Sequence, residues 1–171
     1  MGKRSEMKKK IYIAGPDVFE NNSIEIGQKY VQLCKYYGFE GLYPLDNVIN
    51  FNQEKQKIAQ DIFKANKNLI DSCDIVIANL SSFRGKESDS GTIWECGYAS
   101  ALGKKVYGYI NRDSSYLGQF EENEILVNEH GFTDLKGRLI EDFDYNVNLM
   151  IACSVEEIIV GNFEDVLKKL K

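Results

Sequence analysis

The sequence predicts a doubly wound, flavodoxin-like α/β domain, in which helices cover both faces of a five-stranded parallel sheet. Short, almost entirely apolar runs alternate along the chain with segments of helical spacing, and neither a repeat nor a low-complexity linker interrupts them. Strands that are apolar on both faces are typical of parallel sheets joined by right-handed crossovers. With 171 residues, 43% of them hydrophobic, the chain is also long enough to bury one compact core.

The expected elements follow from the pattern of each run. "KIYIAG" is a buried strand that ends at Gly15 and Pro16, and a second strand ends in "EGLYPLD". "DIVIANL" is the most strand-like run of all, with polar turns on both sides. In chain order, we expect strands at 10–15, 40–46, 74–80, 104–110 and 156–161, and helices at 24–37, 53–71, 90–102 and 163–170.

Two segments do not fit this alternation. Residues 1–9 combine "MGKRSE" with lysines, and we expect them to be a solvated leader or a vector remnant, which leaves 10–171 as a single domain. Residues 111–147 are long, polar and irregular for such a fold. Because long loops of compact domains usually carry function, we expect this segment to be a flap or an oligomer contact.

Composition and charge exclude several function classes. The net charge is −5 and no basic cluster lies inside the expected domain, which argues against a nucleic-acid polymer as partner. No apolar run approaches the ~20 residues of a membrane span and no signal segment is present, so we expect a soluble, cytoplasmic protein without membrane contact.

The sequence also offers no motif for a metal or a cofactor. Four cysteines stand far apart without a C-x-x-C pair, and His130 is the one histidine, so neither a zinc site nor a disulfide framework is expected. "GYASALGKK" is not a phosphate-binding P-loop, because five residues instead of four separate its glycines and Lys105 stands where a P-loop has Ser or Thr. No G-x-G-x-x-G is present either. We therefore expect no cofactor.

The candidate site lies where the strands end. Ligands of open α/β sheets bind beyond the carboxyl ends of the strands, and Gly15, Phe19 and Asp46 follow the first two strands of this sheet. Asp89 and Glu95 flank the start of the helix after the third strand and should converge on the same crevice. Without further information, Glu95 could be a solvated helix residue, Asp89 a helix cap and Asp46 a turn former.

The motifs at these positions resemble the nucleoside 2-deoxyribosyltransferase family. "KIYIAGPDVF", "YPLDN", "LIDSCDIVIANLSSFRGKESDSGTIWECGYASALGKKV" and "NVNLM" match it in order over nearly the whole chain, and D-x-G-T-x-x-E-x-G-x-A is the most diagnostic part. The resemblance implies an enzyme that cleaves the N-glycosidic bond of a 2′-deoxynucleoside and transfers the deoxyribosyl group to another nucleobase.

The resemblance also implies roles for individual residues. Glu95 would be the nucleophile, Asp89 would bind the sugar hydroxyls, and Tyr12 would donate a hydrogen bond to the nucleophile. Asn148 and Met150 would enter from a neighbouring subunit, which implies a homo-oligomer that is a dimer or is built from dimers. Because Ser88 or Ser90 could cap the helix instead, the sequence leaves Asp89 free for the sugar.

One position departs from the family pattern. Many members carry an aspartate that contacts the base and helps to protonate it, and counting back eight residues from Asp74 places Asn66 there. An amide can donate to or accept from a base edge, but it supplies no proton. This departure affects the base preference more than the overall function. Two alternatives remain: a hydrolase of deoxynucleosides or deoxynucleotides in the same superfamily, and a non-catalytic flavodoxin-like module.

Overall fold

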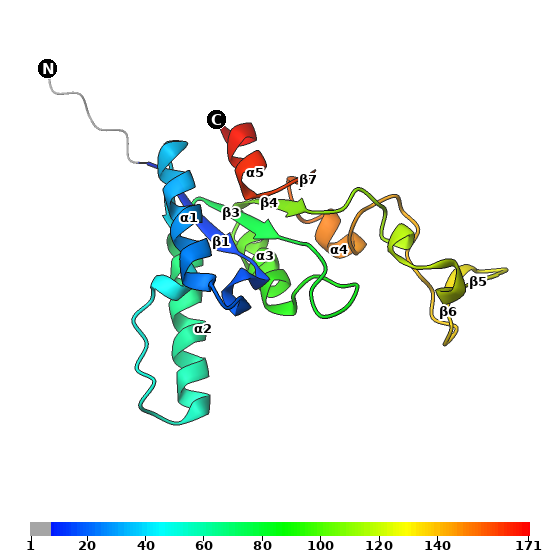
Figure 1. The fold of residues 1–171 in the computed structure, drawn as a ribbon, viewed down its shortest axis with the longest axis horizontal. Helices are drawn as coiled ribbons and strands as arrows, with labels where there is room; N and C mark the ends of the chain where they lie inside the picture. Colours follow the sequence, from blue (N-terminus) through cyan, green and yellow to red (C-terminus); the bar gives the residue numbers. More distant parts are fainter. Residues whose placement is uncertain (1–7) are drawn as a thin grey trace, which may run out of the picture.

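The computed structural model describes residues 8–171, so the first seven residues of the expected leader lie outside it. All five strands of the main sheet run parallel, in the order β2-β1-β3-β4-β7 (Figure 1). This is the doubly wound order that the sequence predicts. The strands are β1 (Lys10–Ala14), β2 (Glu40–Leu42), β3 (Ile75–Asn79), β4 (Lys105–Ile110) and β7 (Glu157–Val160).

Helices cover both faces of the sheet, as predicted. Residues of β1 alternate between two hydrophobic clusters, so that Tyr12 and Ala14 face one side while Ile11 and Ile13 face the other. Helices α1 (Ser23–Tyr36) and α5 (Phe163–Leu170) pack on the face of Ile11. Helices α2 (Lys55–Ser72), α3 (Ser90–Ala101) and α4 (Leu149–Ala152) pack on the face of Tyr12.

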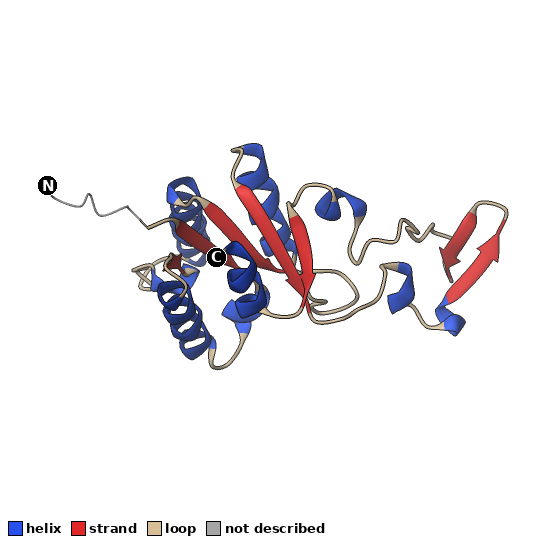
Figure 2. Cartoon of the chain, turned by 90° about the horizontal axis from the view of Figure 1, so that it is seen from above, coloured by secondary structure: helices blue, strands red, loops and turns tan. Residues whose placement is uncertain are grey.

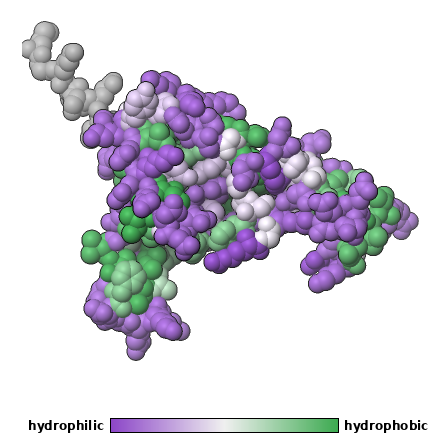
Figure 3. All heavy atoms as spheres, viewed as in Figure 1, coloured by the Kyte–Doolittle hydropathy of each residue, from purple (hydrophilic) through white to green (hydrophobic). Residues whose placement is uncertain are grey.

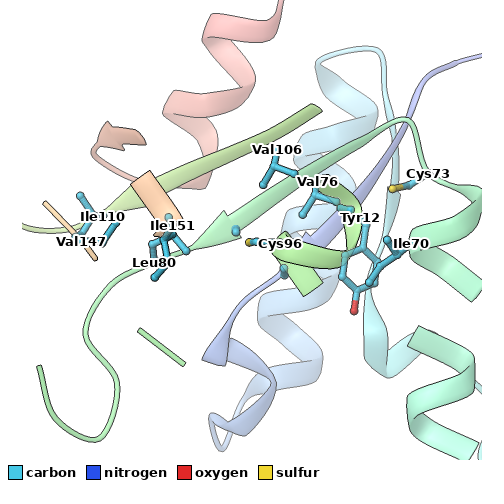
Figure 4. Close-up of a cluster of buried hydrophobic side chains, with 13 residues drawn as sticks. Tyr12, Ile70, Cys73, Val76, Leu80, Cys96, Val106, Ile110, Val147 and Ile151 are labelled. Atoms are coloured by element: carbon cyan, nitrogen blue, oxygen red, sulfur yellow. The ribbon is translucent and has the colours of Figure 1, made fainter. Parts of the chain in front are cut away.

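The register of the sheet determines where Tyr12 lies. Tyr12 pairs with Val76 of β3 and Leu42 of β2, so it stands in the centre of the sheet. Figure 4 shows its ring among the buried side chains of Ile70 and Cys96, which come from α2 and α3. A tyrosine on this face must find a hydrogen-bond partner for its hydroxyl, because an unpaired buried hydroxyl is costly.

The segment 111–147 is more regular than the sequence indicated. It contains an antiparallel hairpin of β5 (Ile125–Asn128) and β6 (Gly131–Asp134), in which Val127 pairs with Phe132. Gly131 closes the turn with a φ of 115°, a conformation that favours glycine. Figure 2 shows the hairpin at the end of an arm, far from the main sheet. The expectation of an irregular segment was wrong because the two strands are only four residues long.

Large hydrophobic side chains reach the surface in several places, and two of these stand out (Figure 3). One is the segment between β2 and α2 together with the first turns of α2, where Leu45, Val48, Phe51 and Phe63 are exposed. The other is the arm formed by residues 111–147, where Leu126 and Val127 are among the exposed residues. Among residues 8–171, no helix combines the length and the apolar character that crossing a membrane requires.

Candidate active site

A cavity of about 390 Å³ opens at the carboxyl ends of the central strands. Its lining comes from four parts of the chain: the turn after β1, the segment after β2, the middle of α2, and the first half of α3. The lining residues are Gly15, Val18, Phe19, Pro44, Leu45, Asn47, Ile49, Phe51, Ile62, Asn66, Asp89, Gly91, Thr92 and Glu95. Five of the expected site residues (Gly15, Phe19, Asn66, Asp89 and Glu95) are thus brought together in one lining.

Glu95 lies in this lining and is held by the sheet below it. The Tyr12 hydroxyl donates a hydrogen bond of 2.6 Å to Glu95 Oε1, across 83 residues of sequence. Tyr12 is fully buried, so this bond satisfies its hydroxyl and fixes one carboxylate oxygen. Among residues 8–171, the other carboxylate oxygen accepts no hydrogen bond, and Glu95 lines the cavity. Gly91, one turn earlier on α3, carries no side chain that could cover it.

Burial controls the charge of Glu95. The pKa of Glu95 is raised from 4.5 to about 7, mainly because burial removes water from the carboxylate. The Tyr12 hydrogen bond lowers this pKa, and the nearby Asp89 carboxylate raises it. Burial thus outweighs the Tyr12 hydrogen bond, which favours the ionised carboxylate. The carboxyl group is therefore poised to change charge near neutral pH. The same burial, together with Glu95, raises the pKa of Tyr12, which stays a donor.

Asp89 is both a helix cap and a member of the cavity lining. Its Oδ2 accepts hydrogen bonds from the Thr92 amide at 2.8 Å and from Thr92 Oγ1 at 2.9 Å. Ser88 does not cap α3, since its hydroxyl donates to the Leu80 carbonyl at 2.7 Å. The expectation that a serine would cap in place of Asp89 was wrong. One carboxylate oxygen suffices for the cap, and among the described residues Oδ1 accepts no hydrogen bond.

Gly15 and Phe19 form the side of the cavity next to β1. A Cβ on Gly15 would lie 2.5 Å from Asp17 Oδ2 and 2.9 Å from Asn79 Cβ, so only glycine fits there. The Phe19 ring is 57% exposed and stacks on the Phe83 ring with centroids 5.5 Å apart. This side of the cavity therefore offers a flat aromatic surface at its mouth.

Two amides stand in the part of the lining formed by α2 and the segment after β2. Asn47 Nδ2 donates to Asn66 Oδ1 at 3.2 Å and to the Pro44 carbonyl at 2.8 Å. Asp46 is exposed and lies outside the lining, whereas its neighbour Asn47 is one of the lining residues. Both residues follow the same strand in sequence, in a short turn that has no regular alternation of side chains.

Asn148 and Met150 do not line the cavity of their own chain. Asn148 caps α4 through a 2.9 Å hydrogen bond from the Met150 amide, and its Nδ2 donates to Glu141 at 2.5 Å. Met150 is 72% exposed beside a groove between α3 and α4. A contribution of these two residues to a site of another subunit stays a prediction.

Sequence reasoning did not identify the apolar part of the lining. Val18, Leu45, Ile49, Phe51 and Ile62 are separated by polar residues and show neither helical nor strand spacing. The available signal was the density of apolar residues in "PLDNVINF", which is unusual for a solvated loop. Apolar side chains in a loop that follows a strand of the site indicate a ligand with a flat hydrophobic surface.

Comparisons with known proteins identify chains with a similar fold or sequence. The structure of a 2-desoxiribosyltransferase from Leishmania mexicana is similar over 94% of this chain and 97% of that one, at 29% sequence identity and a TM-score of 0.70. A 2-deoxyribosyltransferase from Bacillus psychrosaccharolyticus shares the fold over 92% of this chain and 90% of that one, at 22% identity and a TM-score of 0.59.

An uncharacterised protein of Schizosaccharomyces pombe is 31% identical over 109 residues, which are 62% of this chain and 52% of that protein. The chain thus spans about half the length of the curated relative that it matches. The family model described as nucleoside 2-deoxyribosyltransferase matches residues 11–150, a range that holds Tyr12, Asp89 and Glu95. This chain therefore belongs to the nucleoside 2-deoxyribosyltransferase family.

Proposed function

We propose that residues 10–171 form one domain that transfers 2′-deoxyribosyl groups between nucleobases. The observation that carries the proposal is Glu95, a carboxylate on the cavity side of α3 whose second oxygen is held by the buried Tyr12 hydroxyl at 2.6 Å. A fixed carboxylate with one free oxygen suits attack on a glycosidic carbon. Family membership supports nucleosides as the substrate class.

In the first half of the reaction, the free oxygen of Glu95 attacks C1′ of the deoxynucleoside. The C1′–N bond breaks, its electron pair stays with the base nitrogen, and C1′ becomes bonded to the carboxylate as a glycosyl ester. C1′ carries positive character in the transition state, which the adjacent carboxylate stabilises. The departing base takes up one proton.

In the second half, a nitrogen of the incoming base attacks C1′ from the face that the first base left. The C1′–O bond to Glu95 breaks, the carboxylate regains its electron pair, and the attacking nitrogen loses its proton. Two inversions at C1′ give net retention. Water in place of the incoming base would give free deoxyribose, so exclusion of water by the apolar lining at Ile49, Phe51 and Ile62 favours transfer.

The remaining polar groups of the lining divide between sugar and base. Asp89 Oδ1 is the acceptor for a sugar hydroxyl, because its Oδ2 is engaged in the helix cap. Among the lining residues that the structure describes, Asp89 and Glu95 are the titratable ones. The base therefore departs with a hydrogen bond from an amide, and its proton comes from solvent.

We further propose that the active unit is a cytoplasmic homo-oligomer in nucleotide salvage, with Asn148 and Met150 completing the site of a neighbouring subunit. Two observations support this proposal: Met150 is exposed, and it does not line the cavity of its own chain. The groove beside Met150 is lined mostly by small or apolar residues of α3 and α4, which could pack against a second chain.

A base-exchange assay tests the proposed function. Thymidine or deoxyinosine is incubated with adenine, and products are separated by chromatography. Deoxyadenosine is the expected product. Free deoxyribose in place of a new nucleoside would identify a hydrolase, and the absence of both products would identify a binding module. Deoxynucleoside 5′-monophosphates as donors in a parallel reaction distinguish a nucleotide hydrolase.

A further inference from the structure

The amide of Asn47 has one possible orientation. Its Nδ2 lies 2.8 Å from the Pro44 carbonyl oxygen and 3.2 Å from Asn66 Oδ1. A primary amide nitrogen carries two hydrogens, and these two acceptors use both of them. Turning the amide around would place its oxygen against the Pro44 carbonyl oxygen, which is repulsive. Asn47 Oδ1 is thereby fixed as an acceptor.

The orientation of Asn47 determines that of Asn66. Because Asn66 Oδ1 accepts from Asn47, its Nδ2 points away from that bond and retains both of its hydrogens. In the described chain, neither Asn66 Nδ2 nor Asn47 Oδ1 has a hydrogen-bond partner, and both residues line the cavity. The two hydrogen-bonded amides of the lining thus leave one donor, on α2, and one acceptor, on the segment after β2, without a partner in the described chain.

From this pair we infer that the site prefers 6-aminopurines over 6-oxopurines, an inference that rests on the proposed function for its assignment of the cavity to a base. Asn66 Nδ2 donates to N7 of the purine, and Asn47 Oδ1 accepts from the amino group at C6. Adenine presents this acceptor and donor side by side, whereas hypoxanthine and guanine present N7 and O6, which are both acceptors.

The choice of N7 follows from the chemistry of the leaving group. Cleavage of the bond at N9 leaves an electron pair that delocalises over the imidazole ring, so N7 gains negative charge as the bond breaks. A donor at N7 therefore becomes stronger in the transition state, which is the condition for an interaction to accelerate the reaction. Asn66 supplies such a donor, since the two carboxyl groups of the described lining, Asp89 and Glu95, serve the sugar and C1′ in the proposed reaction.

The test is a competition between adenine and hypoxanthine as acceptors for the deoxyribosyl group of thymidine. The wild type should favour adenine by about tenfold, as expected when one neutral hydrogen bond is replaced by two facing acceptors. Asn47→Ala should reduce this ratio to about twofold or less. Asn66→Ala removes the donor that serves both bases, so it should slow both transfers while adenine stays ahead.

Asn50→Ala is the matched control, because Asn50 lies on the same segment but outside the lining. It should leave the ratio unchanged. Circular dichroism verifies that each variant is folded. Calorimetric binding of the two free bases to Glu95→Ala protein measures the same preference without catalysis, so it remains informative if no nucleoside forms and the proposed function fails. Equal use or equal binding of both bases by the wild-type pocket, or a ratio that survives Asn47→Ala, would overturn the inference.

Discussion

The floor and the outer wall of the cavity are built differently. The floor consists of Tyr12, Asp89 and Glu95, which stand on β1 and α3 and are fixed by hydrogen bonds of 2.6 to 2.9 Å. The outer wall consists of the segment after β2 and the middle of α2, where Leu45 and Phe51 are exposed to solvent and the two lining amides are joined at 3.2 Å.

This difference separates two tasks. Covalent chemistry needs a carboxylate held to within a fraction of an ångström, and the central strands of a packed sheet provide that rigidity. Recognition of a flat base needs an apolar surface with one donor and one acceptor, and a loop with a helix flank can supply both. Substitutions in the floor should therefore lower the rate of turnover, whereas substitutions in the wall should change which base is used.

The largest effect is expected from Glu95→Ala. Removal of the nucleophile should lower the rate of base exchange by on the order of 10³-fold or more. Mass spectrometry of the wild type after incubation with a slow 2-fluoro deoxynucleoside analogue should locate the adduct on Glu95. An adduct on any other residue would exclude Glu95 as the nucleophile. It would also mean that the covalent chemistry does not take place at the floor residues.

Asn148→Ala tests whether the floor is complete within one chain. If Asn148 serves the site of a partner, the variant should be nearly inactive, and so should Glu95→Ala. After the two variants are unfolded, mixed and refolded, half of the dimers are mixed and hold one intact site of two. About a quarter of all sites should then recover if subunits assort randomly. No recovery, with mixed dimers verified by mass, would show that each chain builds its own site.

Tyr12→Phe removes the one hydrogen bond that lowers the pKa of Glu95. In the wild type, kcat/KM should rise with pH through the Glu95 pKa of about 7, because the nucleophile must be ionised. In the variant this pKa rises, so the acid limb should move to higher pH and the rate at pH 7 should fall by about tenfold, with partial recovery at pH 9.

Tyr109→Phe serves as the control for this profile, because Tyr109 is buried on the opposite face of the sheet. Its profile should overlay that of the wild type. A Tyr12→Phe profile that keeps the wild-type limb would show that the hydroxyl contributes to packing alone.

Glu95→Gln should show how much the buried Glu95 carboxylate lowers the free energy of unfolding. The folded-state pKa of about 7 lies above the usual 4.5, so the folded protein binds more protons between these values than the unfolded chain does. The free energy of unfolding of the wild type therefore falls as pH rises from 4.5 to 7, by up to about 3 kcal/mol, and stays lower above pH 7.

The glutamine side chain carries no charge, so Glu95→Gln should be more stable than the wild type at pH 8 and about equal to it at pH 4.5. Urea unfolding at both pH values measures the difference. Glu25→Gln, an exposed substitution on α1, controls for the change in net charge. An equal gain at both pH values would mean that the Glu95 carboxyl is not desolvated.

The sequence predicted the floor better than the wall, for a physical reason. Tyr12, Asp89 and Glu95 stand at fixed places on a strand and a helix, and the regular periods of these elements determine which way they face. Asn47 and Asp46 are adjacent in a short turn, where no period decides which one points inward. The hairpin of β5 and β6 escaped prediction because each of its strands is too short to show alternation.

Asn66→Asp should give the smallest effect, and it tests directly whether the wall contacts the base. Aspartate keeps an acceptor for Asn47 Nδ2, so the wall should stay intact and activity should be preserved. Its second oxygen donates to the base only when protonated, unlike the Asn66 amide, which donates at every pH. The variant should therefore show a few-fold change in the purine-to-pyrimidine ratio, or a new fall in rate as pH rises through the pKa of the added carboxyl group.

Asn68→Asp adds the same charge on the exposed side of α2 and should alter neither quantity. If Asn66→Asp also alters neither, the Asn66 side chain does not contact the base, and the wall would have to recognise its ligand by shape alone.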